Sequence, residues 1–189
     1  MTAEEIFARL NAHMITGIML HDQMAEYYDF LDLHGFKRCH EFHALSEFAE
    51  RRGLIRYYIN HYNVLLPETE VTAPEVIPSS WRGYKRTDVD PATKKRAIRD
   101  GFTRWRMWEA DTKKLYQESY SELCEIGEIA AACKVKELVE AVDMELKDVD
   151  RKMIELYSID YDLSAIYLCQ DETHKKYAER EKHIGVDIC

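Results

Sequence analysis

The sequence predicts an all-α protein in which four long helices form one bundle. Apolar residues recur at alternating spacings of three and four along four long stretches, as expected for helices that bury one face. Gly and Pro number only 7 and 4, and every proline lies between residues 67 and 91, so the long stretches are not interrupted. The 189 residues suffice for the core of one domain.

The first two helices are expected to be joined by a tight turn. Thr2 and Glu5 have the spacing of a capping box, which predicts a helix from about residue 2 to residue 33. Gly35 is expected to adopt positive φ in the turn. The second helix is predicted over about 36–65, with Glu41, Leu45, Phe48, Ile55, Ile59 and Tyr62 on its core face. His40, His43, Glu47, Glu50 and Leu54 form a flanking row.

A proline-containing connection over about 66–90 is predicted to follow. Asp90 and Pro91 then form an N-cap followed by proline at the first helical position, which predicts a third helix to about residue 127. A fourth helix is predicted to about residue 158, and a short fifth helix over 159–168. We expect a bundle domain over 1–168 and a charged C-terminal tail over 169–189.

The long connection implies a particular topology. Short links make the first and second helices antiparallel, and likewise the third and fourth, whereas the long link allows the third helix to run parallel to the second. One long crossover is the arrangement of ferritin-like bundles. This order of elements, over about 160 of the 189 residues, resembles the ferritin-like four-helix-bundle superfamily. The segment from His43 to Gly53 is similar to the ferritin stretch that follows a metal-binding His.

Ionisable residues occur on the predicted apolar faces, where they need a partner. They are His21 on the first helix, Glu109 on the third and Glu145 on the fourth, with Asp148 one turn after Glu145. At about 1.5 Å per residue, these positions, His43 and Glu47 lie within one or two turns of mid-bundle. Carboxylates and imidazoles from four helices at one height would form a metal site rich in oxygen and nitrogen donors.

The resemblance implies a dinuclear or mononuclear iron or manganese site and, with it, oxidase or ferroxidase activity. Ferritin-like proteins often bind two ions through one Glu on each of two helices and Glu-x-x-His on the others. Glu109 fits this pattern directly. His21, the His40–His43 pair and the Glu145–Asp148 pair depart from it. The candidate ligands are His21, His40, His43, Glu47, Glu109, Glu145 and Asp148.

Alternatives without metal remain open at this point. His21 can be a hydrogen-bonded core residue, and Glu145 can pair with it. Glu109 can pair with Arg104, Arg106 or Arg82. The second hypothesis is therefore a metal-free helical scaffold for protein–protein interaction or self-assembly. A third is a bundle whose tyrosines and histidines line a small-molecule pocket.

Composition excludes several classes of protein. A net charge of -9 argues against nucleic acid as a partner. No stretch approaches the length of a membrane-spanning helix, and no nucleotide-binding fingerprint or Gly-rich phosphate loop occurs, so neither a membrane nor a nucleotide cofactor is expected. Five cysteines without a CxxC pair, and no secretion signal, favour reduced thiols in the cytoplasm. The 12 tyrosines suit a homo-oligomer interface or a core equally.

Overall fold

The structure is a computed structural model that describes residues 1–78, 81 and 83–184. The described residues form five α-helices, one 3-10 helix and no strand, which confirms the all-α prediction. The helices are α1 Ala3–Phe30, α2 His34–Tyr62, α3 Pro91–Glu125, α4 Ile129–Ser158 and α5 Leu163–Ile184, and the 3-10 helix is η2 Arg86–Asp88. None of the helices in these ranges is long and apolar enough to cross a lipid bilayer.

Two predicted helix starts are confirmed in detail. Thr2 Oγ1 accepts from the Glu5 backbone N–H at 3.2 Å, while the Thr2 backbone N–H donates to Glu5 Oε2 at 2.7 Å. Asp90 Oδ1 accepts from the Thr93 N–H at 2.8 Å at the start of α3. Each cap satisfies a backbone donor that the first helical turn leaves unpaired.

The turn between α1 and α2 differs from the prediction. Asp32, with φ of 60°, takes the left-handed conformation instead of Gly35, which lies within the first turn of α2. Gly35 is required for another reason. A Cβ there would lie 2.5 Å from the carbonyl oxygen of Gln170, so glycine allows α5 to approach the start of α2.

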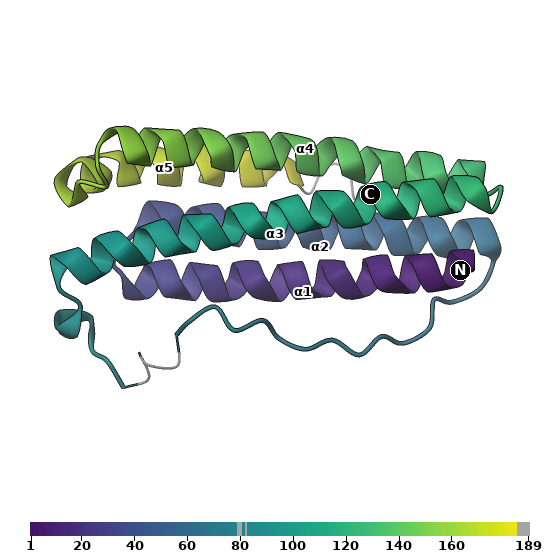
Figure 1. Ribbon diagram of the computed structural model, residues 1–189, viewed down its shortest axis with the longest axis horizontal. Coiled ribbons are helices and arrows are strands. Elements are labelled where there is room, and N and C mark those ends of the chain that lie inside the picture. Colours follow the sequence, from purple (N-terminus) through teal and green to yellow (C-terminus); the bar gives the residue numbers. More distant parts are fainter. Residues whose placement is uncertain (79–80, 82, 185–189) are drawn as a thin grey trace.

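The crossover runs the length of α1, as predicted. Successive contacts join Asn11 to Thr69, Gln23 to the Val76 N–H, and Asp29 to Arg86. The connection therefore carries the chain from one end of the bundle to the other, and α2 and α3 run in the same direction (Figure 1).

The C-terminal region is more ordered than the expected tail. Residues 163–184 form α5, which packs on α2 and buries Ile166, Gln170 and Tyr177. The prediction of a short helix over 159–168 and a charged tail was therefore wrong in its bounds. The sequence signal is weak because α5 buries only one narrow stripe among many charged residues. The remainder of the predicted tail, 185–189, lies outside the described residues.

The core consists of two apolar clusters with a polar layer between them. One cluster includes Met24, Phe102 and Val149, and the other includes Met14, Tyr116 and Val142. α1, α2, α3 and α4 each contribute residues to both clusters. Between these residues, near the middle of each helix, the inward positions are polar or small. Because burying polar groups is unfavourable without partners, this layer is where function is to be sought.

Candidate metal centre

The polar layer brings together six of the seven predicted ligand residues. α1 contributes His21, α3 Glu109 and α4 Glu145. The remaining three come from α2, which places His40, His43 and Glu47 on its buried face. We call these six residues the central cluster.

The buried face of α2 is the predicted flanking row, and the predicted core row is wrong. Leu45 and Phe48 are 42% and 44% exposed, whereas His40, His43 and Glu47 are 0%, 2% and 6% exposed. Around the middle of α2 the predicted core row therefore faces outward. Hydrophobicity misleads there because three ionisable residues occupy the inner face, which is apolar toward both ends of the helix.

His21 lies at the centre of one half of the cluster. Its Nε2 is 3.6 Å from Glu109 Oε1 and 3.9 Å from Glu47 Oε1. Its Nδ1 is 2.9 Å from His40 Nδ1, so one of the two rings donates to the other. Three helices thus converge on one imidazole.

The other half joins α2 to α4. His43 Nδ1 lies 3.3 Å from Glu145 Oε1. The rings of His40 and His43 each lie 4.9 Å from the Trp105 ring, between centroids, so an apolar indole fills the space between the two histidines and α3.

Two tryptophans hold the carboxylates. Trp105 Nε1 donates to Glu109 Oε1 at 2.8 Å, and Trp108 Nε1 donates to Glu47 Oε1 at 3.4 Å. Sequence reasoning missed both donors. The available signal was spacing, because Trp105 stands four residues before Glu109 and therefore on the same face of α3.

Gly17 creates the room for Glu47. A Cβ at residue 17 would lie 2.2 Å from Glu47 Oε2, so any other residue would occupy the space of the carboxylate. Gly17 lies one turn before His21 on the same face of α1, so its lack of a side chain allows Glu47 to lie beside His21.

Burial shifts the pKa of every cluster member toward its neutral form. It lowers the pKa of His21 to about 3 and holds the pKa values of His40 and His43 well below the usual range. Burial raises the pKa of Glu109 to about 7, against the effect of the Trp105 hydrogen bond. The pKa values of Glu47 and Glu145 are raised well above normal, first by burial and then by the Glu109 charge.

Several donor atoms of the cluster have no hydrogen-bond partner among the described residues. They are His40 Nε2, both ring nitrogens of His43, and Glu109 Oε2; the 3.3 Å contact of His43 Nδ1 with Glu145 Oε1 lacks hydrogen-bond geometry. The Glu109 and Glu145 carboxyls are close enough to interact, and burial favours the protonated form of both. Unpaired buried polar atoms are costly, and carboxylate oxygens and imidazole nitrogens are ligand types that transition-metal ions take.

The donor set fits a divalent transition-metal ion in chemistry and burial. Two ligand atoms on opposite sides of one ion are about 4.2 Å apart, twice a typical metal–ligand distance. The distances from His21 Nε2 to Glu109 and Glu47, 3.6 and 3.9 Å, are within this limit. Within the described ranges, however, no three His, Cys, Asp or Glu side chains are placed to hold one ion together.

Asp148, the seventh predicted ligand, makes its contacts away from the cluster. Its Oδ2 accepts from Tyr177 Oη at 3.0 Å, and its carboxylate also pairs with Lys176, Arg180 and Arg151. These partners come mainly from α5, the helix that sequence reasoning did not delimit.

The ion pairs considered for Glu109 are not formed by the described arginines. Arg104 donates to the backbone carbonyl of Glu75, and Arg106 Nε donates to Asp150 at 2.6 Å. Arg82 lies outside the described residues. The partner of Glu145 is His43 rather than His21.

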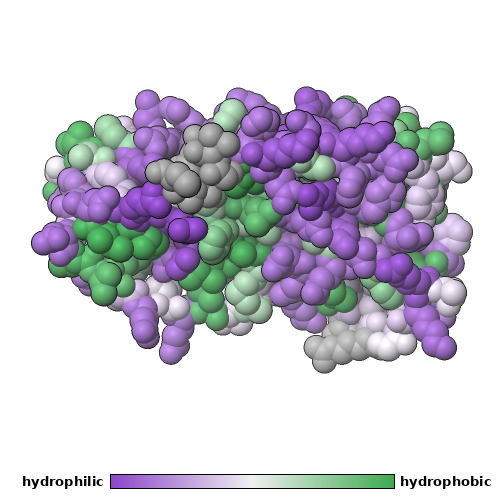
Figure 2. All heavy atoms as spheres, turned by 180° about the vertical axis from the view of Figure 1, so that it is seen from behind, coloured by the Kyte–Doolittle hydropathy of each residue, from purple (hydrophilic) through white to green (hydrophobic). Residues whose placement is uncertain are grey.

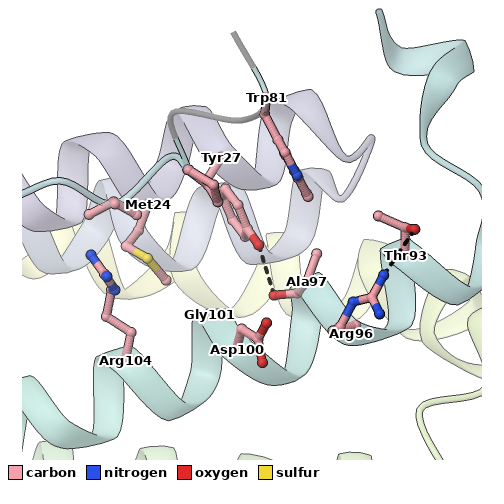
Figure 3. A pocket seen from close by; sticks show the side chains of 11 residues that line it. Met24, Tyr27, Trp81, Thr93, Arg96, Ala97, Asp100, Gly101 and Arg104 are labelled. Carbon is pink, nitrogen blue, oxygen red and sulfur yellow. Dashed lines mark hydrogen bonds between the residues drawn. The ribbon is translucent and has the colours of Figure 1, made fainter. Parts of the chain in front are cut away.

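A separate cavity of about 300 Å³ lies between the crossover, α1 and α3 (Figure 3). The Tyr27 hydroxyl donates to the Ala97 carbonyl at 3.0 Å beside it, and Tyr27 stacks on Trp81 with centroids 5.4 Å apart. These contacts attach the crossover to the bundle. The histidines of the central cluster do not line this cavity.

Comparison with solved structures finds a protein described as a humanized archaeal ferritin. The match has a TM-score of 0.75 and covers 91% of this chain and 94% of that chain, at 15% sequence identity. This chain has the ferritin-like fold. The predicted crossover bundle is thereby confirmed. No protein-family model matches the sequence, and no curated protein matches it.

The central cluster departs from the ligand pattern of ferritin-like proteins, as the sequence indicated. It holds three histidines and three glutamates, and α2 alone supplies three of the six. Glu50, one turn beyond Glu47 on α2, adds a further carboxyl whose pKa burial raises to about 8. Glu50 was absent from the predicted ligands, although its i, i+3 spacing from Glu47 was a signal.

Proposed function

We propose that this ferritin-like chain binds divalent iron or manganese, at a mononuclear or dinuclear site, in its central cluster. The observation that carries the proposal is the buried set of imidazoles and carboxylates with unpartnered atoms on His40, His43 and Glu109. Fold similarity to an archaeal ferritin adds support. Because no three of these side chains among the described residues are placed to hold one ion, ligation requires that they rearrange on binding.

Each group has a distinct part in this proposal. Glu47, Glu109 and Glu145 supply negative charge that an ion would neutralise, and His21 and His43 supply nitrogen donors. Trp105 and Trp108 orient the Glu109 and Glu47 carboxylates through their indole N–H groups, as partners of ligands commonly do. A bound iron or manganese ion supplies redox and Lewis-acid chemistry, which makes oxidase or ferroxidase activity the implied reaction class.

The direct test is metal analysis of purified protein, before and after loading with Fe(II) or Mn(II). We expect the wild-type chain to retain at least one ion per chain and Glu109→Gln to bind at least about tenfold more weakly, about 1.4 kcal/mol. Glu118→Gln is the matched control, because Glu118 lies on the exposed side of α3. This variant should bind the metal ion as tightly as the wild-type chain does. Failure of the wild-type chain to retain any ion under either condition would remove the proposal.

A second candidate function is a metal-free helical scaffold. The observation in its favour is the set of internal hydrogen bonds, His21 with His40 and each tryptophan with its glutamate, which partly satisfy the cluster without an ion. An unchanged melting temperature of Glu109→Gln, with and without metal, would support the scaffold. A metal-dependent loss of stability would argue against it.

We also infer that the chain self-associates and that it is a cytoplasmic protein. Cys39, Cys124, Cys133 and Cys169 are free thiols, which suits a reducing compartment. Leu45 and Phe48 are exposed apolar residues on α2 that would suit a subunit contact. The face opposite the view of Figure 1 is mostly hydrophilic but carries apolar patches (Figure 2). Light scattering on the purified chain measures its oligomeric state.

A further inference from the structure

A pocket of about 370 Å³ opens between α2 and α4 beside the last turn of α5. Glu50 and Gly53 of α2, Glu137 and Ala141 of α4, and His183 of α5 contribute to its lining. It therefore lies where α5 ceases to cover the junction of α2 and α4.

The pocket follows from the course of α5. This helix runs parallel to α2, with Gln170 beside Gly35 and Tyr177 beside Phe42. Tyr177 is fully buried and its ring lies 6.0 Å from that of His43, so α5 closes the cluster on this side. Beyond this point several residues of α2 and α4 that line the pocket are small. A Cβ added at Gly53 would meet no atom within 4 Å.

Glu50 connects the pocket to the central cluster. It lies on the pocket wall, one helical turn from Glu47 and two turns from His43, and therefore on the same face of α2. It is half-buried, unlike its neighbour Glu47. Its carboxylate is thus intermediate in position between solvent and the buried ligands.

The exposure of the cluster carboxylates points to the same side of the bundle. The side chain of Glu145 on α4 is 21% exposed, whereas those of Glu47 and Glu109 are 8% and 1% exposed. The histidines of the cluster are at most 2% exposed. Among the described residues of the cluster, solvent access is thus greatest at Glu145, which lies one helical turn after Ala141 of the pocket.

We propose that this pocket is the route by which a hydrated divalent cation reaches the central cluster, and that Glu50 binds the cation transiently on the way. The inference rests on the proposed metal binding. Carboxylate oxygens from Glu50 and Glu137 and the His183 imidazole are suitable donors for such ions. Lys134 also lines the pocket, but it is paired with Glu137. Within the described part of the chain, Glu50 forms no such ion pair.

The test measures how fast Co(II), a spectroscopic probe for divalent cations, enters the protein in stopped-flow absorption experiments. Glu50→Gln removes the ionisable carboxyl with little change of shape. Gly53→Phe adds a bulky side chain to the pocket wall, at a position where an added Cβ meets no atom within 4 Å. Glu155→Gln is the control, because Glu155 is an exposed α4 residue at the other end of the bundle.

We expect uptake at least about tenfold slower in Glu50→Gln and Gly53→Phe than in wild type or Glu155→Gln. The amount finally bound by Gly53→Phe should match that of wild type, since an obstructed route changes rate and not capacity. Equal uptake rates in all four proteins would overturn the route while leaving metal binding intact. Loss of bound Co(II) at equilibrium in Glu50→Gln would make Glu50 a ligand and also overturn it. If wild type binds no Co(II), both proposals fail.

Discussion

At the scale of single residues, Glu47 can be buried in the central cluster only because Gly17 has no side chain. The Glu47 carboxylate occupies the space that any Cβ at residue 17 would fill, at 2.2 Å from the nearest oxygen. Gly17→Ala should therefore displace the carboxylate and weaken Mn(II) binding at least about tenfold, about 1.4 kcal/mol, as measured by calorimetric titration.

Gly53→Ala is the control for this substitution, because its Cβ meets nothing. Alanine favours a helix interior over glycine by about 1 kcal/mol at either position, so lost helix propensity cannot explain weaker binding in Gly17→Ala. Equal Mn(II) affinities for the two variants would show that Glu47 is not a ligand.

The shifted pKa values of single residues predict how the stability of the metal-free protein depends on pH. Glu109 and Glu50 have folded-state pKa values of about 7 and 8 against an ordinary 4.5, so the folded chain binds more protons than the unfolded chain between these values. Their contribution to stability is therefore lost as pH rises through that window. For His21, with a pKa of about 3 against 6.5, stability is lost as pH falls below 6.5.

We therefore expect the melting temperature of the metal-free protein to be higher at about pH 6 than at about pH 8. Glu109→Gln cannot ionise and should reduce this difference. Circular dichroism melts in the presence of a chelator measure it. A melting temperature that rises from about pH 6 to about pH 8, equally in wild type and Glu109→Gln, would contradict the assigned shifts.

Sequence reasoning found most of the central cluster but not its partners. His21, Glu109 and Glu145 interrupt apolar faces, and that pattern reveals them directly. Asp148 shares a helix face with Glu145 by spacing, yet it turns to Tyr177 because α5 supplies hydrogen-bond and ionic partners. Gly17 gives no sign in the sequence, since its importance depends on a side chain 30 residues away.

At the scale of elements, α5 shows why the C-terminal region was hard to predict. Its buried stripe consists of Ile166, Gln170 and Tyr177, spaced by four and seven residues, and two of these three are polar or amphipathic. A hydrophobic pattern read without its partner helix does not distinguish such a stripe from a solvated segment. The crossover was easier, because proline in the interior of a helix breaks it whatever the tertiary contacts are.

Gln170 on α5 acts as the cap of α2. The N-cap residue Leu33 offers no side-chain acceptor, and Gln170 Oε1 instead accepts from the N–H groups of Gly35 at 2.8 Å and Phe36 at 3.2 Å. Gln170→Ala leaves buried N–H groups unpaired, which costs about 1–3 kcal/mol each. We expect a loss of at least about 2 kcal/mol in the free energy of unfolding, measured by urea denaturation.

Gln117→Ala, on the exposed side of α3, is the control and should cost less than about 0.5 kcal/mol. If Gln170→Ala were no more destabilising than this control, α5 would not be an integral part of the bundle. The same result would weaken the view that α5 closes one side of the central cluster.

At the scale of the whole molecule, the crossover determines which residues can meet. It lies along α1, so α3 starts at the end of the bundle where α2 starts, and Glu109 reaches the level of His21 and Glu47 (Figure 1). An up-and-down connection would reverse α3. The predicted topology is confirmed, and it brings six of the seven candidate residues to one level of the bundle.

The central claim is tested most directly by anomalous diffraction from crystals soaked in Mn(II). The account predicts an anomalous peak in the polar layer, within about 2.5 Å of the His21 imidazole and the Glu109 carboxylate. Peaks confined to surface carboxylates, with the His21–His40 and Trp105–Glu109 hydrogen bonds unchanged, would contradict it and leave the buried cluster as a scaffold.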